Sequence, residues 1–413
     1  MKNPFNPFKA EPPAPQAKPT EAKRGEHAAS FAFAMQYDST PLPLARENAS
    51  RGWVEYGADN AYPDFLLELL DTSALHSGIV AGKSFLVAGG DFLVGGVPLA
   101  QWAESAPTDR ATAVRSFVEN SYGEHWSDLK SMAATDYVVS GSFALEVIWS
   151  LDFSRIAEVK HISWACLRPE PKDEEGRVPG YWYAPQWRKT GRMKTEPVRI
   201  QAFDINAHVP DGEAVPDAHP YDHRQVLYVR NHSASEYFGR PVYAGAINDI
   251  RTSAALSEWM LGSAENGFTP SVVITYHEPP QSKEEGNAIA SSMMKQFANK
   301  GGARKIAVLF ANSKDSAPTI TPLAVKNIDD SLIAVSDKVQ NSIVTGHAVT
   351  SPELVGVSVP GLLGSGDIQL KWNIFNATVI KPTKAVIERT FTMLAEVNGV
   401  TEDISFQDIN PLA

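Results

Sequence analysis

The chain has 413 residues, and its 43% hydrophobic content is enough for roughly two or three domains with real cores. A formal net charge of -11 argues against a protein that holds nucleic acid tightly through counterion release, because such surfaces are normally basic. One cysteine, Cys166, excludes an intramolecular disulfide framework and a cysteine-based zinc site, so a reducing cytoplasm fits best.

The N-terminal segment, residues 1–30, is rich in proline, lysine and alanine and lacks the continuous apolar stretch of a signal peptide. We therefore expect a disordered N-terminal arm. Phe31–Tyr37, which follows, is a candidate short strand or anchoring segment. Residues 78–100 are the most membrane-like part of the chain, but Lys83, Asp91 and several glycines interrupt them, so we expect no membrane-spanning helix.

The first third then has the character of a mixed α+β fold. Its patterns predict helices over residues 63–70, 73–87, 107–122 and 126–139, and a strand over 143–149. From residue 164 to 231, short apolar runs alternate with turn residues. They predict strands at 181–183, 198–203 and 226–229, so we expect a small β-rich subdomain here.

The most distinctive stretch is residues 237–276, which predict one long helix beginning at Pro241 and ending at Asn266-Gly267. Small and apolar residues recur at steps of three and four and form one seam suited to packing against another helix: Ile247, Ile250, Ala254, Ser257, Leu261 and Ala264. A charged stripe follows beside it at every seventh residue: Arg251, Glu258 and Glu265. The alternative interpretation is an ordinary core helix.

Downstream, we expect a strand at 272–276, a capped helix from Ser282 to about Asn299, and a strand pair at 306–310 and 320–323. The short polar segment 324–331 leads into a helix with an apolar face, which Gly346 ends. Asp329 and Asp330 lie at the positive end of that helix, where carboxylates are favoured.

The last part of the chain predicts a loop over 349–366, a long helix over 369–397 and a strand at 404–406. Pro382 cannot donate a hydrogen bond to the preceding turn, so we expect it to kink or split the long helix near Ile380.

No motif gives a specific sign of chemistry. Gly361–Gly366 lacks the lysine and hydroxyl ending of a P-loop, so a flexible connector is the favoured interpretation. His219 and His223, together with Asp222, lie in a proline-rich loop without a further metal ligand of recognisable spacing, which favours a solvated turn. We therefore predict no enzyme, no catalytic residues, no metal and no cofactor.

One basic cluster is of note, and its residues surround an aromatic side chain: Trp187, Arg188, Lys189, Arg192, Lys194 and Arg199. An exposed hairpin is the simpler interpretation. The alternative is a docking surface for an acidic partner or a phosphate backbone.

In this order, the elements resemble a portal protein of tailed double-stranded DNA bacteriophages, of the long-tailed phage type. The resemblance spans residues 52–412. It is carried by Tyr237-Phe-Gly-Arg-Pro241, by Asn266-Gly-Phe-Thr-Pro270, by the Lys305–Phe310 strand and by Val349–Gly356. The Pro382 helix and the Ile404–Asp408 strand close the series, and residues 53–63 are similar to the Gly-x-Asp-Asn-x-x-Pro opening of some portals.

The resemblance implies an α+β portal fold that assembles into a ring, usually of twelve subunits in the virion. After the arm, the wing would comprise 31–160 and 269–365, the β-rich clip 161–235, the helical stem 236–268, and the C-terminal helix and short crown 366–413. The tunnel loop would be 324–331, so its DNA-facing residues would be Lys326, Asn327, Asp329 and Asp330. Arg251, Glu258 and Glu265 would line or edge the channel, and Trp187, Arg188, Lys189 and Arg192 would dock the clip's partners.

The implied function is to form the channel at one capsid vertex through which double-stranded DNA is packaged and ejected, without sequence specificity. The implied partners are the large terminase, the head-tail adaptor and the major capsid or scaffold protein, with no membrane. The implied location is the virion, after assembly in the host cytoplasm. Another ring-forming head-tail connector or adaptor is the first alternative, and a nucleotide-dependent enzyme that uses residues 361–366 is the second.

Overall fold

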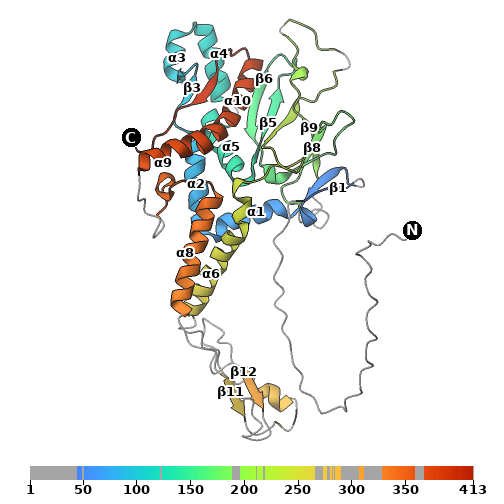
Figure 1. The fold of residues 1–413 in the computed structure, drawn as a ribbon. Coiled ribbons are helices and arrows are strands. Elements are labelled where there is room, and N and C mark those ends of the chain that lie inside the picture. Colours follow the sequence, from blue (N-terminus) through green and yellow to red (C-terminus); the bar gives the residue numbers. More distant parts are fainter. Residues whose placement is uncertain are drawn as a thin grey trace, which may run out of the picture. The chain divides into compact units, whose positions relative to one another are not determined.

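The computed structural model describes residues 44–48, 51–120, 123–187, 196–210, 212–216, 219–265, 273–276, 280, 282, 284–289, 307–310, 328–358 and 367–412 (Figure 1). The predicted arm, residues 1–30, and the Phe31–Tyr37 segment lie outside these residues. Within them, the predicted mixture of helices and strands is confirmed.

Two helices follow a short hairpin at the start of the described chain. The hairpin pairs β1 (Ala45–Asn48) with β2 (Trp53–Tyr56), and the helices are α1 (Tyr62–Thr72) and α2 (Ala74–Ala88). Both helices match their prediction. Pro63 stands in the first turn of α1, and Gly89, with a φ of 68°, ends α2 as expected for glycine.

The motif Gly57-Ala-Asp-Asn60 forms η1 (Ala58–Asn60), a tight turn with left-handed backbone at Asp59 and Asn60. Asn60 is buried, and its Oδ1 accepts from the Tyr56 backbone N–H at 2.9 Å and from Arg168 Nε at 2.7 Å. Asn tolerates this backbone region better than most residues. The turn therefore anchors a buried arginine from a strand more than a hundred positions away.

A second group of elements was largely missed by the sequence analysis. β3 (Phe92–Val94), β4 (Val97–Pro98) and α3 (Leu99–Ser105) are too short to show a periodic pattern, whereas α4 (Thr108–Glu119) and α5 (Trp126–Ser140) were predicted. β3 lies between β4 and β13 (Ile404–Phe406) in a three-stranded antiparallel sheet. The C-terminal strand is thus paired with the first third of the chain.

The central sheet has six strands in the order β6-β5-β10-β9-β8-β7. Their bounds are Ser142–Trp149 (β5), Ile156–His161 (β6), Leu167–Pro169 (β7), Gly180–Tyr183 (β8), Val198–Ala202 (β9) and Arg224–Arg230 (β10). All neighbours are antiparallel except β9 and β10, which are parallel. The short helices η2 (Trp164–Cys166) and η4 (Ile205–Ala207) connect them.

Alternation along β5 assigns the two faces of this sheet. Phe143, Leu145 and Val147 enter the main core with side chains from α1, α2, α5 and the later helix α10 (Lys381–Val397), while Ala144 joins a smaller cluster on the opposite face with Tyr181. Successive side chains in a strand point to opposite faces, so one eight-residue strand supplies both cores.

The predicted domain bounds stay a prediction, and the topology shows strand pairing across them. β5 pairs with both β6 and β10, so one sheet joins strands from the predicted wing and the predicted clip. Likewise, side chains of α10 (Lys381–Val397) and β13 share a core with Phe92 and Trp126. Strand pairing between distant segments leaves no trace in local sequence composition.

The outer edge of β6 is covered by side chains instead of a further strand. Asn120 Nδ2 donates to Val159 O at 2.6 Å, Glu124 Oε2 accepts from His161 N at 2.6 Å, and Asn398 both accepts from Ile156 N and donates to Ile156 O. Pairing an edge strand's backbone groups in this way blocks unwanted strand addition.

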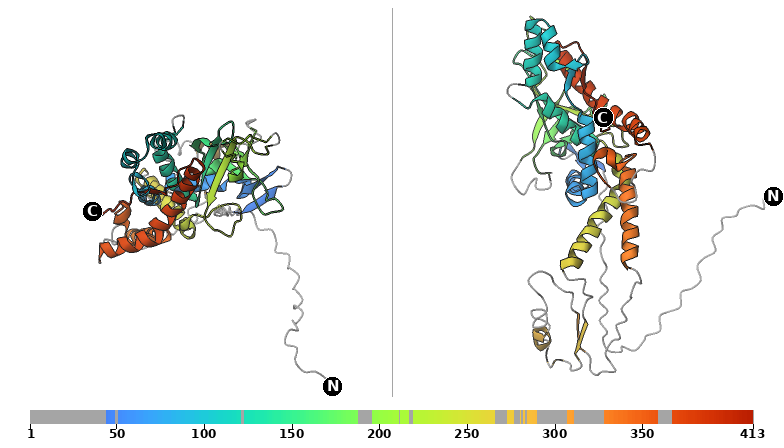
Figure 2. Two further views of the ribbon diagram at one scale, coloured as in Figure 1. Left: turned by 90° about the horizontal axis from the view of Figure 1, so that it is seen from above. Right: turned by 90° about the vertical axis from the view of Figure 1, so that its left-hand side faces the viewer.

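The predicted long helix begins as the short helix η5 (Val242–Ala246) and continues as α6 (Ile247–Glu265). It lies beside α8 (Ile328–Gly346), as Figures 1 and 2 both show. β11 (Val273–Tyr276) and β12 (Ala307–Phe310) pair in parallel. Ser282 Oγ accepts from Glu285 N, as the capping pattern predicted. The strand predicted at 320–323 lies outside the described residues.

After α8 come η6 (Pro352–Val355), α9 (Ile368–Phe375), the π-helical segment η7 (Asn376–Ile380) and α10 (Lys381–Val397). The helix is therefore split where Pro382 predicted. Pro382 has no N–H to donate to the turn before it. The wider π turn over Asn376–Ile380 accommodates this missing hydrogen bond, so the backbone remains helical through Lys381.

Candidate functional site

The helices α6 and α8 form a pair that we call the stem pair. They run in opposite directions, because Gly346 at the end of α8 lies against Ala246 just before α6. A Cβ at Gly346 would overlap the Ala246 side chain, so glycine allows the two segments to approach closely. The right-hand view of Figure 2 shows the two helices extending in the same general direction from this contact and moving apart toward their far ends.

The two halves of the stem pair differ in burial. Near the Ala246–Gly346 contact, Ile250 and Ile343 are both fully buried. In the other half, which we call the distal half, large apolar side chains are exposed: Trp259, Met260 and Leu261 on α6 and Ile333 and Val335 on α8. Leu261 is 61% exposed and Ile333 is 60% exposed. An apolar surface of this kind on one pair of helices is typical of an interaction site.

Within the chain, only part of the predicted apolar seam is buried. Ile247 and Ile250 are buried, Leu261 is exposed, and Ala264 has no described side-chain position. The seam was predicted to suit packing against another helix. α8 lies beside α6, and the buried part of the seam is the part near the Ala246–Gly346 contact.

The predicted charged stripe lies on α6. Arg251 is half-buried and Glu258 is exposed, while Glu265 is the last residue of the helix. The three positions repeat every seventh residue and therefore share one face of the helix.

The four predicted DNA-facing residues divide into two groups. Lys326 and Asn327 lie outside the described residues, whereas Asp329 and Asp330 stand in the first turn of α8, which starts at Ile328. The expectation that these two aspartates occupy the positive end of a helix is thus confirmed. The last four residues of the predicted tunnel loop are helical.

The predicted clip docking residues also divide. Arg188, Lys189 and Arg192 lie outside the described residues, but Trp187 is only 6% exposed. Its Nε1 donates to Cys166 O at 2.8 Å, its ring contacts that of Trp53, and the Arg168 guanidinium lies 4.8 Å from the ring centre. Trp187 therefore packs in the protein's own interior, and the docking role predicted for this cluster stays a prediction. Sequence does not distinguish a buried tryptophan from an exposed one.

The sequence analysis missed a buried polar junction where the stem pair meets the rest of the fold. His76 of α2 and His347, just after α8, are both fully buried, and their rings lie against Tyr243 of η5. His76 Nδ1 is 2.9 Å from His347 Nε2, and Lys83 Nζ donates to His347 O at 2.9 Å. Isolated histidines with no motif spacing give no sequence signal for such a contact.

Burial sets the protonation of this junction. It lowers the pKa of His76 to about 4, and burial together with the Lys83 charge lowers the pKa of His347 to about 2. Both rings are therefore neutral at pH 7. Burial also lowers the pKa of Lys83, to about 8. The junction links α2, η5 and the turn after α8. One N–H group forms the hydrogen bond between His76 Nδ1 and His347 Nε2, and both imidazoles are neutral.

Among the residues that the structure describes, no group of three or more His, Cys, Asp or Glu side chains is placed to hold a metal ion. In the same part of the chain, no helix has the length and apolar character needed to cross a bilayer.

No protein-family model and no curated protein matches this sequence. Some solved structures do match the fold of this chain. A chain in the neck of a native gene transfer agent (GTA) particle, computed with C12 symmetry, aligns with a TM-score of 0.52 and 13% identity over 84% of this chain and 85% of that one. A chain in the neck of an empty GTA particle, computed with C6 symmetry, aligns with a TM-score of 0.51 and 12% identity over 82% of each chain.

An HK97 family phage portal protein from Corynebacterium diphtheriae also aligns, over 84% of this chain and 95% of that one, with 10% identity and a TM-score of 0.41. The chain thus shares its α+β fold with chains of GTA particle necks.

Proposed function

We propose that this chain is a portal protein: a subunit of the ring-shaped head-tail connector at one capsid vertex of a phage-like particle, through which double-stranded DNA is packaged and ejected. The supporting fold likeness extends over more than four-fifths of the chain and concerns the necks of particles treated with rotational symmetry. A ring of identical subunits is the assembly that such symmetry describes.

The exposed distal half of the stem pair is the observation that carries the proposal. In an isolated chain, Trp259, Met260 and Leu261 would remain in contact with water next to Ile333 and Val335. Burying apolar surface stabilises a contact by about 25 cal/mol per Å². Side-by-side packing of stem pairs around a ring would bury these side chains and leave a central hole.

The charge of the chain suits a channel through which DNA slides. Strong phosphate contacts would hold the duplex, whereas a net charge of -11 and a stripe that carries Glu258 and Glu265 would not. We assign Arg251, Glu258 and Glu265 to the channel side of the stem. We assign Lys326, Asn327, Asp329 and Asp330 to the loop and helix start that approach DNA.

The remaining assignments follow from the same model of the particle. The large terminase during packaging, and then the head-tail adaptor, would dock on the β-rich part of the chain near Arg188, Lys189 and Arg192. The major capsid or scaffold protein would contact the outer part of the ring. The ring would be located in the virion and would be assembled in the host cytoplasm. In the virion it would usually contain twelve subunits.

Electron microscopy of the purified full-length protein, together with mass photometry, tests the proposal. Perforated rings of uniform subunit number support it, and a monomer at every concentration contradicts it. In particles, deletion of residues 324–327 ahead of α8 is expected to leave rings intact and to impair DNA packaging or retention. Normal DNA-filled heads from that variant would contradict the assigned loop.

The first alternative is another ring-forming connector or adaptor of the particle. The stem pair favours the portal, because a channel for DNA needs a wall. For the enzyme alternative, residues 361–366 lie outside the described residues, and assays of nucleotide binding and hydrolysis by the purified protein would decide it.

A further inference from the structure

A groove beside the free edge of β1 lies close to the point where the N-terminal arm joins the described chain. The groove has a volume of about 680 Å³. It is bounded by Leu44, Ala45 and Glu47 on one side, by the loop of residues 233–241 on another, and by the start of the stem pair at residues 244–248. Its first wall residue, Leu44, is also the first residue that the structure describes.

Among the described residues, the backbone of β1 is paired on one side only. The Gly57 N–H donates to Leu44 O at 2.8 Å, and the register pairs Arg46 with Glu55. Hydrogen-bonded positions alternate in an antiparallel pair, so Arg46 and Asn48 point their backbone groups at β2, and Ala45 and Glu47 point theirs away. No described residue is paired with these outward groups of Ala45 and Glu47. The edge of β1 can therefore accept another strand.

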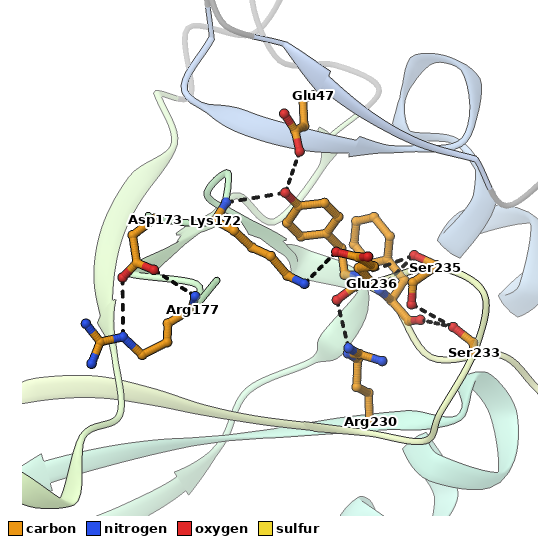
Figure 3. A network of polar contacts seen from close by, with 10 residues as sticks. Glu47, Lys172, Asp173, Arg177, Arg230, Ser233, Ser235 and Glu236 are labelled. Atoms are coloured by element: carbon orange, nitrogen blue, oxygen red, sulfur yellow. Dashed lines mark hydrogen bonds and ion pairs between the residues drawn. The ribbon is translucent and has the colours of Figure 1, made fainter. Parts of the chain in front are cut away.

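This open edge contrasts with the outer edge of β6, which Asn120, Glu124 and Asn398 cover. It is also firmly held in place. Glu47 Oε1 accepts from the Tyr237 hydroxyl at 2.5 Å, and the same hydroxyl accepts from Lys172 N at 3.3 Å. Figure 3 shows Glu47 above this network, in which Lys172 pairs with Glu236 and Arg230 donates to the Glu236 backbone. β1 is thus tied to the loop of residues 233–241 through Glu47 and Tyr237.

The arm contains a segment with the pattern of a strand that fits this edge. In Phe31-Ala-Phe-Ala-Met-Gln-Tyr37, the large side chains Phe31, Phe33, Met35 and Tyr37 alternate with small or polar ones. In a strand, the four large side chains would share one face. Added to the edge of β1, that face would cover the groove, because Ala45 and Glu47 of β1 have their side chains in the groove wall.

The connection between this segment and β1 favours a neighbouring copy as the acceptor. Residues 38–43 include Pro41 and Pro43, and each proline holds both itself and the residue before it in extended backbone. With residues 40–43 extended, only Asp38 and Ser39 remain for a turn back onto the chain's own β1. Six extended residues reach at most about 20 Å. A pair of packed helices is also about 20 Å wide, so the connection is long enough to reach a neighbouring copy packed beside the stem pair.

We propose that residues 31–37 of one copy add as a strand to the free β1 edge of the next copy, with Phe33 inserted in the groove beside the stem pair. This inference rests on the proposed ring, because it needs an adjacent copy in a fixed position. Each arm would link two subunits, and the ring would be closed by strand exchange as well as by stem contacts.

The test places a photo-crosslinking benzoylphenylalanine at position 33 of the full-length protein, with the same residue at position 32 as the matched control. The expected result is a dimer-sized product on a denaturing gel whose cross-linked peptide maps to residues 44–48 or 233–248. The control should give little of this dimer-sized product, because in the proposed strand the side chain at position 32 points to the face opposite that of position 33. Ring formation is followed separately by mass photometry.

A second variant, Ala45→Pro, removes an outward backbone donor without touching the bonds between β1 and β2. It should lose the dimer-sized product while its unfolding temperature stays unchanged. A monomer-sized product mapped to the same groove overturns exchange between copies. Intact rings without any groove product overturn the inference and leave the portal proposal standing, whereas the absence of rings overturns both.

Discussion

His76 Nδ1 lies 2.9 Å from His347 Nε2, so α2 is hydrogen-bonded to the turn that follows α8 inside the protein. The other two ring nitrogens, His76 Nε2 and His347 Nδ1, have no partner among the described residues. Neither ring can gain a proton without adding a charge to a buried site that already faces Lys83. This link joins the stem pair to the body of the fold and depends on neutral histidines.

The first prediction concerns acid sensitivity. The pKa of His76 is about 4 in the folded protein and near 6.5 when unfolded, so the unfolded chain binds more protons between these values. Stability is therefore lost as pH falls from about 6.5 toward 4, by about 3 kcal/mol at most from His76. The double variant His76→Gln, His347→Gln should show a flatter decline. The surface variant His232→Gln should follow the wild type, and three parallel curves of unfolding temperature against pH would refute the assignment.

The second prediction concerns the close packing of α2 against η6. A Cβ at Gly82 would overlap the carbonyl oxygen of Val355, which is backbone and cannot rotate away. Gly82→Ala should therefore destabilise the protein by about 2 kcal/mol or more. The matched variant is Gly78→Ala, one turn earlier on the same helix, where the new Cβ would meet only the Val357 side chain at 3.2 Å. Equal unfolding midpoints in denaturant for the two variants would show this packing to be loose.

The third prediction tests the turn that anchors Arg168. Asn60→Ala removes the acceptor shared by Tyr56 N and Arg168 Nε and leaves a buried guanidinium partly unpaired. The expected loss is about 3 kcal/mol, within the range measured for buried charged groups. Asn60→Asp keeps both acceptors and adds a favourable charge, so it should recover most of the stability. If chemical denaturation gives the same midpoint for both variants, the hydrogen bonds are not responsible.

The fourth prediction concerns the covered edge of β6. The double variant Asn120→Ala, Asn398→Ala exposes the backbone of Ile156 and Val159, which the two side chains now pair. We expect faster aggregation at high concentration, because a free strand edge can pair with another chain. Asn206→Ala serves as the control, since Asn206 bonds only within its own turn. Light scattering during incubation gives the readout, and unchanged scattering would contradict the role given to this edge.

Much of this fold could be predicted from sequence, where local chemistry decides the outcome. The bounds of α1, α2 and α5 follow from Pro63, Gly89 and Gly141, and Pro382 marks the split before α10. What could not be predicted depends on contacts across the chain. Examples are the pairing of β5 with β10, the burial of Trp187 and the meeting of His76 with His347, each set by tertiary packing.

The fifth prediction separates the two surfaces of the stem pair. Leu261 is exposed in the distal half of α6, and the proposed ring buries it against the next copy. Leu261→Asp would place a carboxylate in that contact, where an unpaired buried charge costs several kcal/mol, repeated at every interface. Rings should therefore be lost, while the unfolding temperature of the subunit changes little, because the side chain is exposed in the single chain.

The control for the fifth prediction is Glu258→Ala, three residues earlier on the same helix. Glu258 is exposed and is assigned to the channel side, so its replacement should leave the rings intact. Mass photometry of both variants gives the subunit number directly. If Glu258→Ala dissolves the rings and Leu261→Asp does not, the charged stripe forms the contact between subunits and the apolar residues face the channel. That result would reverse the orientation of the stem, since a channel wall of exposed leucine and tryptophan offers DNA neither charge nor hydrogen bonds.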